Sequence, residues 1–201
     1  MMQKSVNREF ITFLICFITL LGSSKCSFAQ TECKPTEEFE VGDTATYKFR
    51  LLPILKCETL KKLAIRITEN RGWVVFSSLQ GIDQGFRYSN KVKLGFLSED
   101  IAIAKNLESL EISELGIDQL PNGIINLSNL EVLDISFNRL DIAKELPKIL
   151  SLSNLKTLKM YGSKFSETEL YEIKNKLPQI KILYSPDHLL EESKALRENK
   201  K

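Results

Sequence analysis

One arrangement of apolar residues occurs four times between residues 107 and 185, and it limits the possible fold more than any other feature of the chain. The four segments begin 23, 25 and 25 residues apart. Their apolar positions are Leu107, Leu110 and Ile112; Leu130, Leu133 and Ile135; Leu155, Leu158 and Met160; and Ile180 and Leu183, with Ser185 in the third place. A fixed period of this length indicates an array of small units, none of which can bury its apolar side alone. Such an array favours an extended binding surface over an enclosed catalytic pocket.

The spacing inside each unit predicts a short strand followed by a helical return. The second and third apolar residues of each segment lie two apart, as they must if a strand points both to one face. Apolar spacings of three or four at residues 120–127 and 142–152 predict helical or irregular segments that pack on the strands. Ser166 and Glu169 form a capping-box pattern for a helix that ends at Leu177, because Pro178 cannot continue it. The predicted class is α/β, a short curved solenoid with parallel strands on its concave side.

The segment Leu-Glu-Val-Leu-Asp-Ile-Ser-Phe-Asn-Arg-Leu at residues 130–140 resembles the leucine-rich repeat at every defining position. The resemblance implies that Asn138 is a buried structural residue whose amide satisfies backbone groups in the turn after the strand. Leu115 and Ser163 stand where the neighbouring units would carry that asparagine. A partial match at residues 60–65 predicts one earlier strand. The chain is similar on these grounds to the leucine-rich repeat family.

Residues 1–29 have the layout of a secretory signal peptide. Lys4 and Arg8 precede an apolar run at residues 10–21, and a small, polar stretch ends at Ala29, where cleavage is expected. A bilayer span needs about 20 apolar residues, so neither this run nor any later stretch is predicted to cross a membrane. The expected location is secreted or periplasmic, with a lipid anchor on Cys26 as the alternative. Together with the Leu-Pro turn at residues 120–127, this layout resembles the secreted bacterial members of the family.

Residues 30–106 form the predicted N-terminal cap region. Cys33 and Cys57 are expected to form a disulfide in an oxidising compartment, worth about 3 kcal/mol in the chain-entropy model. Strand-like patterns occur at residues 44–51, 72–76 and 92–96. They are compatible either with degenerate repeats or with a separate cap of β structure. Trp73 and Phe86 are expected in its core, and ligand stacking is the alternative for Trp73.

The repeats at residues 107–186 are followed by a predicted capping helix and tail at residues 187–201. Asp187 is its expected N-cap, and charged residues surround its few leucines. Covering the last repeat is the preferred interpretation of this helix. Docking of the helix onto a partner is the alternative.

Charge and motifs argue against an enzyme and against a nucleic-acid partner. Removal of the predicted signal peptide takes away three basic residues and one acidic residue and leaves 25 of each sign. A net charge of zero gives no attraction to a polyanion. The single histidine, His188, has no serine or cysteine arrangement beside it that would make a nucleophile. No phosphate, zinc or calcium motif occurs in the sequence, so neither a metal nor a cofactor is expected.

Residues that alternate with the buried leucines are expected to face outward from the strands, where the family resemblance places binding. Three outward columns follow from the spacing: Ser109, Val132, Thr157 and Ile182; Glu111, Asp134, Lys159 and Tyr184; and Ser113, Ser136, Tyr161 and Pro186. Aromatic residues beside charges are typical anchors for a protein partner. The predicted partner-binding residues are Glu111, Asp134, Ser136, Lys159, Tyr161 and Tyr184.

Two functional hypotheses follow, and a third, an enzyme whose site lies in residues 34–106, has no supporting motif. The first is an exported leucine-rich repeat protein that binds a protein partner through its concave strand face. The second is a structural or carbohydrate-associated protein of the cell envelope, in which the repeats form only a scaffold. Glu111 beside Asp134 is also compatible with a cation site or an acid/base pair, although Lys159 in the same column would neutralise the two carboxylates.

Overall fold

The computed structural model describes residues 33–42, 47–67 and 93–198. Contacts divide the chain into Met1–Glu32 and Cys33–Lys201, and all the described residues belong to the second unit. The predicted signal peptide and its alternative, a lipid anchor on Cys26, lie outside the described residues. So do Trp73, Phe86 and the strand-like pattern at residues 72–76.

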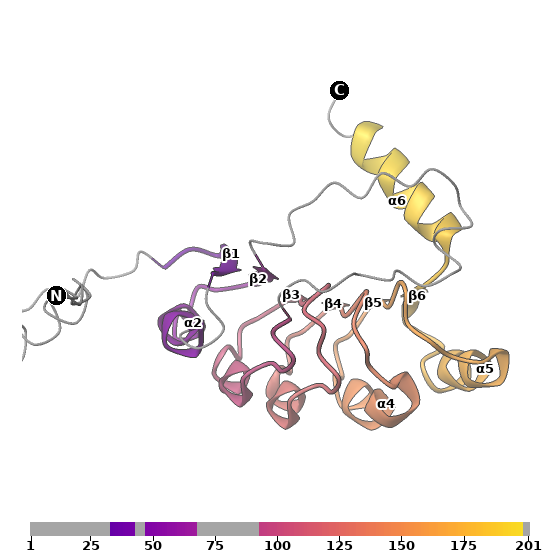
Figure 1. Cartoon of the computed structure of the whole chain (residues 1–201), viewed down its shortest axis with the longest axis horizontal. Helices are drawn as coiled ribbons and strands as arrows, with labels where there is room; N and C mark the ends of the chain where they lie inside the picture. The colour runs from indigo at the N-terminus through magenta and orange to yellow at the C-terminus, as the bar shows by residue number, and fades with distance from the viewer. Residues whose placement is uncertain (1–32, 43–46, 68–92, 199–201) are drawn as a thin grey trace, which may run out of the picture. The chain divides into compact units, whose positions relative to one another are not determined.

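In the described part of the chain, six parallel strands form one sheet in which neighbours in space are also neighbours in sequence. The strands are β1 (Thr36–Val41), β2 (Lys62–Ile67), β3 (Ser109–Glu111), β4 (Val132–Asp134), β5 (Thr157–Lys159) and β6 (Lys181–Leu183). Parallel neighbours need a connection that crosses back over the sheet. In Figure 1 the strands follow one another in chain order, from β1 to β6.

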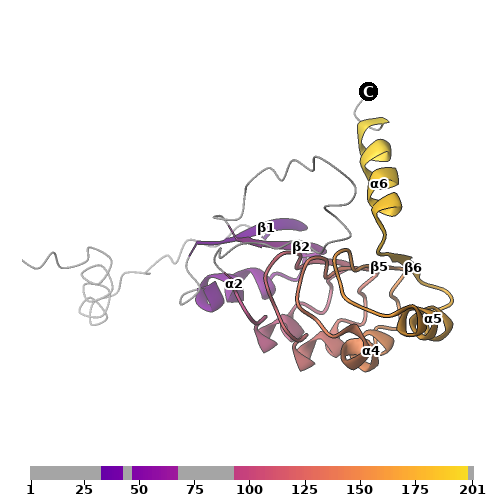
Figure 2. The ribbon, with the colours of Figure 1, turned by 45° about the vertical axis from the view of Figure 1, so that its right-hand side comes forward.

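The connections carry short helical segments on one side of the sheet, as the apolar spacing predicts (Figures 1 and 2). They are α2 (Tyr47–Leu55), η3 (Glu99–Ile103), η4 (Asn122–Asn126), α4 (Ile142–Leu150) and α5 (Glu167–Lys176). The capping box of Ser166 and Glu169 at the start of α5 is confirmed. The core lies between the strands and these segments, where Leu110, Leu133 and Leu158 are completely buried. The short solenoid of the α/β class is thereby confirmed.

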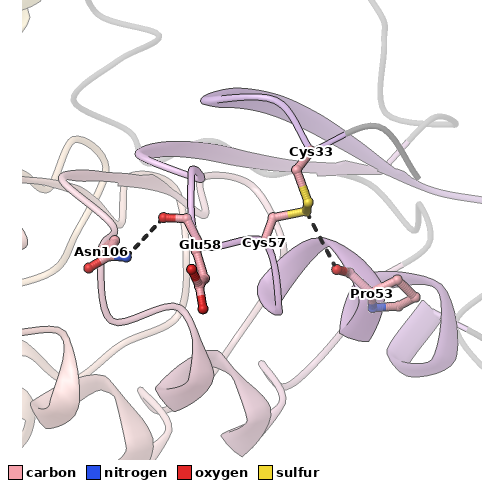
Figure 3. The surroundings of a disulfide bond; sticks show 5 residues. All are labelled: Cys33, Pro53, Cys57, Glu58 and Asn106. Carbon is pink, nitrogen blue, oxygen red and sulfur yellow. Dashed lines mark hydrogen bonds between the residues drawn. A yellow bond between two sulfur atoms is a disulfide. The ribbon is translucent and has the colours of Figure 1, made fainter. Parts of the chain in front are cut away.

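Residues 33–67 continue the same sheet as the repeats. β1 pairs with β2 over six residues, and β2 pairs with β3. β2 confirms the strand predicted from residues 60–65. A disulfide joins Cys33 to Cys57 and connects the approach to β1 with the end of α2 (Figure 3).

The strand predicted at residues 44–51 is wrong, because α2 begins at Tyr47. Tyr47, Leu51 and Leu55 are buried at spacings of four, which is the period of a helix face. The apolar residues of this segment also fit the alternating pattern of a strand over eight residues, so the helical period was not recognised. Residues 93–96 do not form the strand predicted there; Leu94 and Gly95 instead donate backbone hydrogen bonds to the carbonyl of Leu115.

The register of β6 differs by one residue from the prediction. Leu158 pairs with Ile182 and Lys159 pairs with Leu183. Ile182 therefore points into the core, and its predicted outward position is wrong. Paired positions of β5 and β6 differ by 24 in residue number, whereas those of β4 and β5 differ by 25. A shift of one residue moves every side chain of a strand to the other face.

The last helix, α6 (Pro186–Glu198), directly follows β6. The hydroxyl of Ser185 accepts a hydrogen bond from the backbone N–H of His188, so Ser185, and not Asp187, occupies the capping position. In both views α6 lies on the opposite side of the sheet from α4 and α5 (Figures 1 and 2).

Candidate binding surface on the strand face

The side of the sheet that faces away from α2, η3, η4, α4 and α5 is called the strand face here. Its central residues are half-buried: Ser109, Glu111, Val132, Asp134, Thr157 and Lys159. Parallel sheets are ordinarily covered on both faces. Within residues 33–42, 47–67 and 93–198, α6 is the one helix that lies on this face (Figure 2).

A row of charged side chains crosses the strand face. Arg66 of β2 donates to Glu38 of β1 at 3.0 Å and pairs with Glu111 of β3 at 2.8 Å. Burial disfavours the charged form of Arg66, but Glu111 and Glu38 outweigh burial and raise the pKa of the guanidinium. Arg66 was not among the predicted partner-binding residues, although it stands two residues beyond Ala64, which pairs with Glu111.

Asp134 stands next to Glu111 in this row, since the two residues are paired across β3 and β4. Its carboxylate accepts a hydrogen bond from the backbone N–H of Ser136 at 3.0 Å. Burial raises the pKa of Asp134, and the negative charge of Glu111 adds to the rise, whereas Ser136 and Lys159 act against it. Among the described residues no cation forms an ion pair with Asp134. Its negative charge is offset by the hydrogen bond from Ser136 and by the nearby charge of Lys159.

Lys159 forms an ion pair with Glu192 of α6 at 2.7 Å. Tyr161 donates its hydroxyl proton to the other carboxylate oxygen of Glu192 at 2.9 Å. Burial alone would raise the pKa of Glu192, but the hydrogen bonds from Lys159 and Tyr161 outweigh burial and lower it. Burial and the bond to Glu192 raise the pKa of the Tyr161 hydroxyl.

Ser136 and Tyr161 are not exposed, in contrast to the prediction. Their side chains are only 2% and 5% accessible. The hydroxyl of Ser136 accepts a hydrogen bond from the backbone N–H of Tyr161 at 3.1 Å, and the ring of Tyr161 stacks on Phe137. The strands that precede them, β4 and β5, are only three residues long, so Ser136 and Tyr161 lie in the turns after these strands, where the outward alternation no longer applies.

Tyr184 does not join the column of Glu111, Asp134 and Lys159, because Leu183 occupies that place. Its ring contacts Phe165 and His188, and its hydroxyl accepts a hydrogen bond from Lys174 of α5 at 3.1 Å. The predicted place of Tyr184 beside Lys159 on the strand face is therefore wrong, and its hydroxyl group contacts α5 instead.

Asn138 lies in the turn after β4 and is buried. Its amide nitrogen donates to the carbonyls of Ile112, Ile135 and Ser136, and its oxygen accepts from the N–H of Ile117 at 3.2 Å. The side chain thereby joins two successive units through their backbones.

A polar groove at the start of the strands was missed by the sequence analysis. It has a volume of about 440 Å³ and is lined by Glu58, Lys61, Asn106, Glu108, Asn129, Glu131 and Asn154. Its three asparagines each donate to a backbone carbonyl of the preceding unit, as Asn106 does to Glu58 in Figure 3. Asparagine directly before the first leucine of three consecutive units was the available signal.

Neither a metal centre nor a membrane-spanning helix is present in the described part of the chain. No group of three or more histidine, cysteine, aspartate or glutamate residues there is arranged to hold a metal ion. The helices described for this chain are too short or too polar to cross a bilayer.

The parallel strands in chain order, the one-sided helical returns and the asparagine turn define a fold of the leucine-rich repeat type. Among solved structures, the chain is similar to a leucine-rich repeat protein of Leptospira interrogans, with 24% sequence identity and a TM-score of 0.43. The match covers 65% of this chain and 33% of the other, so the chain spans about a third of the length of that protein. No protein-family model and no curated protein matches the sequence.

Proposed function

We propose that the protein is an exported, non-enzymatic leucine-rich repeat protein that binds a protein partner through the strand face. The observation that carries the proposal is Asp134, a half-buried carboxylate beside Glu111 at the centre of that face. The binding site centres on these two residues, and the partner presents a cationic side chain to them.

The energetics of Asp134 support a binding role. A buried carboxylate with a raised pKa disfavours folding at neutral pH, since the folded state must hold its charge away from water. In a purely structural scaffold, a carboxylate with a raised pKa would only lower the stability of the fold. Proteins commonly keep such destabilising groups at functional sites. An arginine or lysine of a partner would form an ion pair with Asp134 when it buries the face, in addition to the charge of Lys159 nearby.

The surroundings of Asp134 are suited to a protein ligand. Val132 and Thr157 lie beside it on the strand face and provide apolar contact area. Arg66 and Lys159 flank the two acidic residues, so a pair of negative charges lies between two positive ones on this face. Complementary charge patterns of this kind determine which partner binds and how fast.

The proposal can be tested by site-specific photo-cross-linking in the native host. A photoreactive amino acid at Val132 is expected to capture a discrete protein partner, and the same amino acid at Tyr171, which is exposed on α5, serves as the matched control. The adduct should disappear when Asp134→Lys is added. Equal adducts at both sites, or an adduct at Val132 that survives Asp134→Lys, would contradict the proposal.

Export is the second part of the proposal, and the disulfide between Cys33 and Cys57 is compatible with it. The intact mass of the protein from its host, measured with and without reductant, tests this part. We expect a chain that starts at Gln30, with two cysteines that react with an alkylating agent only after reduction. A lipid-modified chain that starts at Cys26 would place the protein on a membrane surface.

A further inference from the structure

We propose that Lys159 and Tyr161 form a carboxylate clamp on the strand face, and that α6 is a displaceable internal ligand of this clamp. In the structure the clamp holds Glu192. An acidic side chain of a protein partner replaces Glu192 when the partner binds. The inference rests on the proposed function in one respect, because the partner must approach the strand face.

The geometry of the clamp is specific for a carboxylate. Lys159 Nζ lies 2.7 Å from Oε1 of Glu192, and Tyr161 donates to Oε2 at 2.9 Å. Each oxygen of one carboxylate thus meets its own donor, and one of the donors is charged. Charge-assisted bonds of this kind are stronger than neutral ones. Asp134, next to Lys159 in the row, disfavours a second acidic group and so limits the clamp to one carboxylate.

The two donors are positioned by the repeats and not by α6. Lys159 belongs to β5 and is paired with Asp134 on one side and Leu183 on the other. The ring of Tyr161 stacks on Phe137, with centroids 6.4 Å apart. Gly162 allows this stack, because a Cβ at that position would lie 2.6 Å from the Phe137 ring. The clamp therefore keeps its shape when Glu192 leaves.

The attachment of α6 is weak by comparison. The hydrogen bonds and ion pairs described between α6 and the repeats involve only Glu192 and His188. His188 lies in the first turn of α6 and accepts a hydrogen bond from the backbone N–H of Tyr184. From Lys194 to Glu198 the helix is exposed wherever its side chains are described. Segments with few buried contacts open at low free energy. Displacement of α6 is therefore compatible with an intact repeat core.

A tethered ligand competes at a high effective concentration, in the millimolar range for short flexible connections. An external carboxylate can bind only to the molecules whose clamp is free of Glu192. Its apparent affinity for the clamp is therefore the intrinsic affinity multiplied by the fraction of molecules with a free clamp. Removal of Glu192 should restore the intrinsic affinity. This difference between occupied and free clamp can be measured on the full chain.

The test uses the full chain with Glu192→Lys, which repels Lys159, and with Glu198→Lys as the matched control on the same helix. The probe is a synthetic peptide with the sequence of residues 186–198, whose binding is followed by NMR shifts of the Lys159 and Tyr161 amides. We expect Glu192→Lys to bind the peptide at least tenfold more tightly than the wild type or Glu198→Lys. A peptide with glutamine in place of Glu192 should lose this binding, as should Lys159→Met added to Glu192→Lys.

Equal binding by the wild type and Glu192→Lys, or by the two peptides, would overturn the inference. Glu192→Gln, which keeps the shape of the side chain, provides a second variant if Glu192→Lys lowers the stability of the fold. The cross-link at Val132 separates this inference from the proposed function. Peptide binding without that adduct would support the clamp alone, whereas the adduct without peptide binding would support strand-face recognition and refute the clamp.

Discussion

At the scale of single residues, Asn138 shows how one side chain can connect two units. Its amide makes four hydrogen bonds to backbone groups of its own unit and the preceding one. We expect Asn138→Ala to lower the free energy of unfolding by about 3 kcal/mol, because it leaves several buried backbone groups without partners. Urea denaturation measures this loss. Asn154→Ala, which removes one exposed hydrogen bond, should cost less than about 1 kcal/mol and serves as the control.

For Asp134 we expect the opposite effect, a substitution that stabilises the fold. Its pKa is raised in the folded state, so its charge destabilises the fold above that pKa, and the penalty disappears as the pH falls and the carboxyl group is protonated. Asp134→Asn should therefore raise the urea midpoint at pH 7. The difference from the wild type should shrink toward zero below pH 3.8, the ordinary value for an aspartate. A difference that is constant with pH would show that the charge is not its cause.

The sequence predicted Asn138 because its position relative to the leucines is distinctive, but it misplaced Ser136 and Tyr161. Both follow three-residue strands, and the chain then turns through a left-handed backbone conformation at Phe137, with φ 56°, and at Gly162, with φ 68°. Alternation of side chains holds only while the strand continues. The burial of Tyr161 additionally depends on Glu192, a partner 31 residues away that no local pattern reveals.

At the scale of secondary-structure elements, α6 is held by a group that titrates. The pKa of Glu192 is lowered below its ordinary value of 4.5, so its contribution to docking is complete above pH 4.5 and is lost as the pH falls through the lowered value. The groups that act on it are Lys159, Tyr161 and Lys181. We expect hydrogen exchange of the α6 amides, corrected for intrinsic rates, to accelerate at acidic pH before that of β4. Simultaneous acceleration of both would argue against independent release of α6.

We expect the disulfide to stabilise β1 and α2 more than the rest of the sheet. It closes a segment with a sequence separation of 24, for which the chain-entropy model gives about 3 kcal/mol. Replacement of both Cys33 and Cys57 by alanine should lower the free energy of unfolding by about that amount. Exchange should increase first in residues 36–55, with β5 less affected. Equal acceleration across the sheet would indicate that the bond acts on the whole fold.

Secondary structure was predictable wherever apolar spacing and capping residues agreed. The capping box fixed the start of α5 at Ser166, and the leucine pattern located β3, β4 and β5, and β6 with a register one residue off. The helix α2 was missed because eight residues with alternating character also satisfy a helical period. The position of α6 was not predictable, because its contacts with the strand face, such as the ion pair between Lys159 and Glu192, are a property of the tertiary structure.

At the scale of the whole molecule, each unit contacts mainly its neighbours, so stability is a sum over units and the interfaces between them. Leu133 is completely buried in β4, and Leu133→Ala should cost about 2–5 kcal/mol and accelerate exchange throughout the sheet. Ile173, buried in α5, lies near the end of the array. Ile173→Ala should cost a similar amount but affect chiefly residues 160–198. Exchange mass spectrometry distinguishes the two patterns, and identical patterns would show that the array unfolds as one unit.

The row of asparagines at the start of the strands has a consequence for how such a chain can change in length. Asn129 bonds to the carbonyl of Lys105, and Asn154 bonds to the carbonyl of Ser128, so each unit attaches to main-chain atoms of the unit before it. Main-chain atoms are the same whatever the side chains are. A duplicated unit of 25 residues, inserted between two existing ones, would find the same attachment points on both sides. Duplication of a gene segment would therefore enlarge the strand face and keep this row of main-chain attachments.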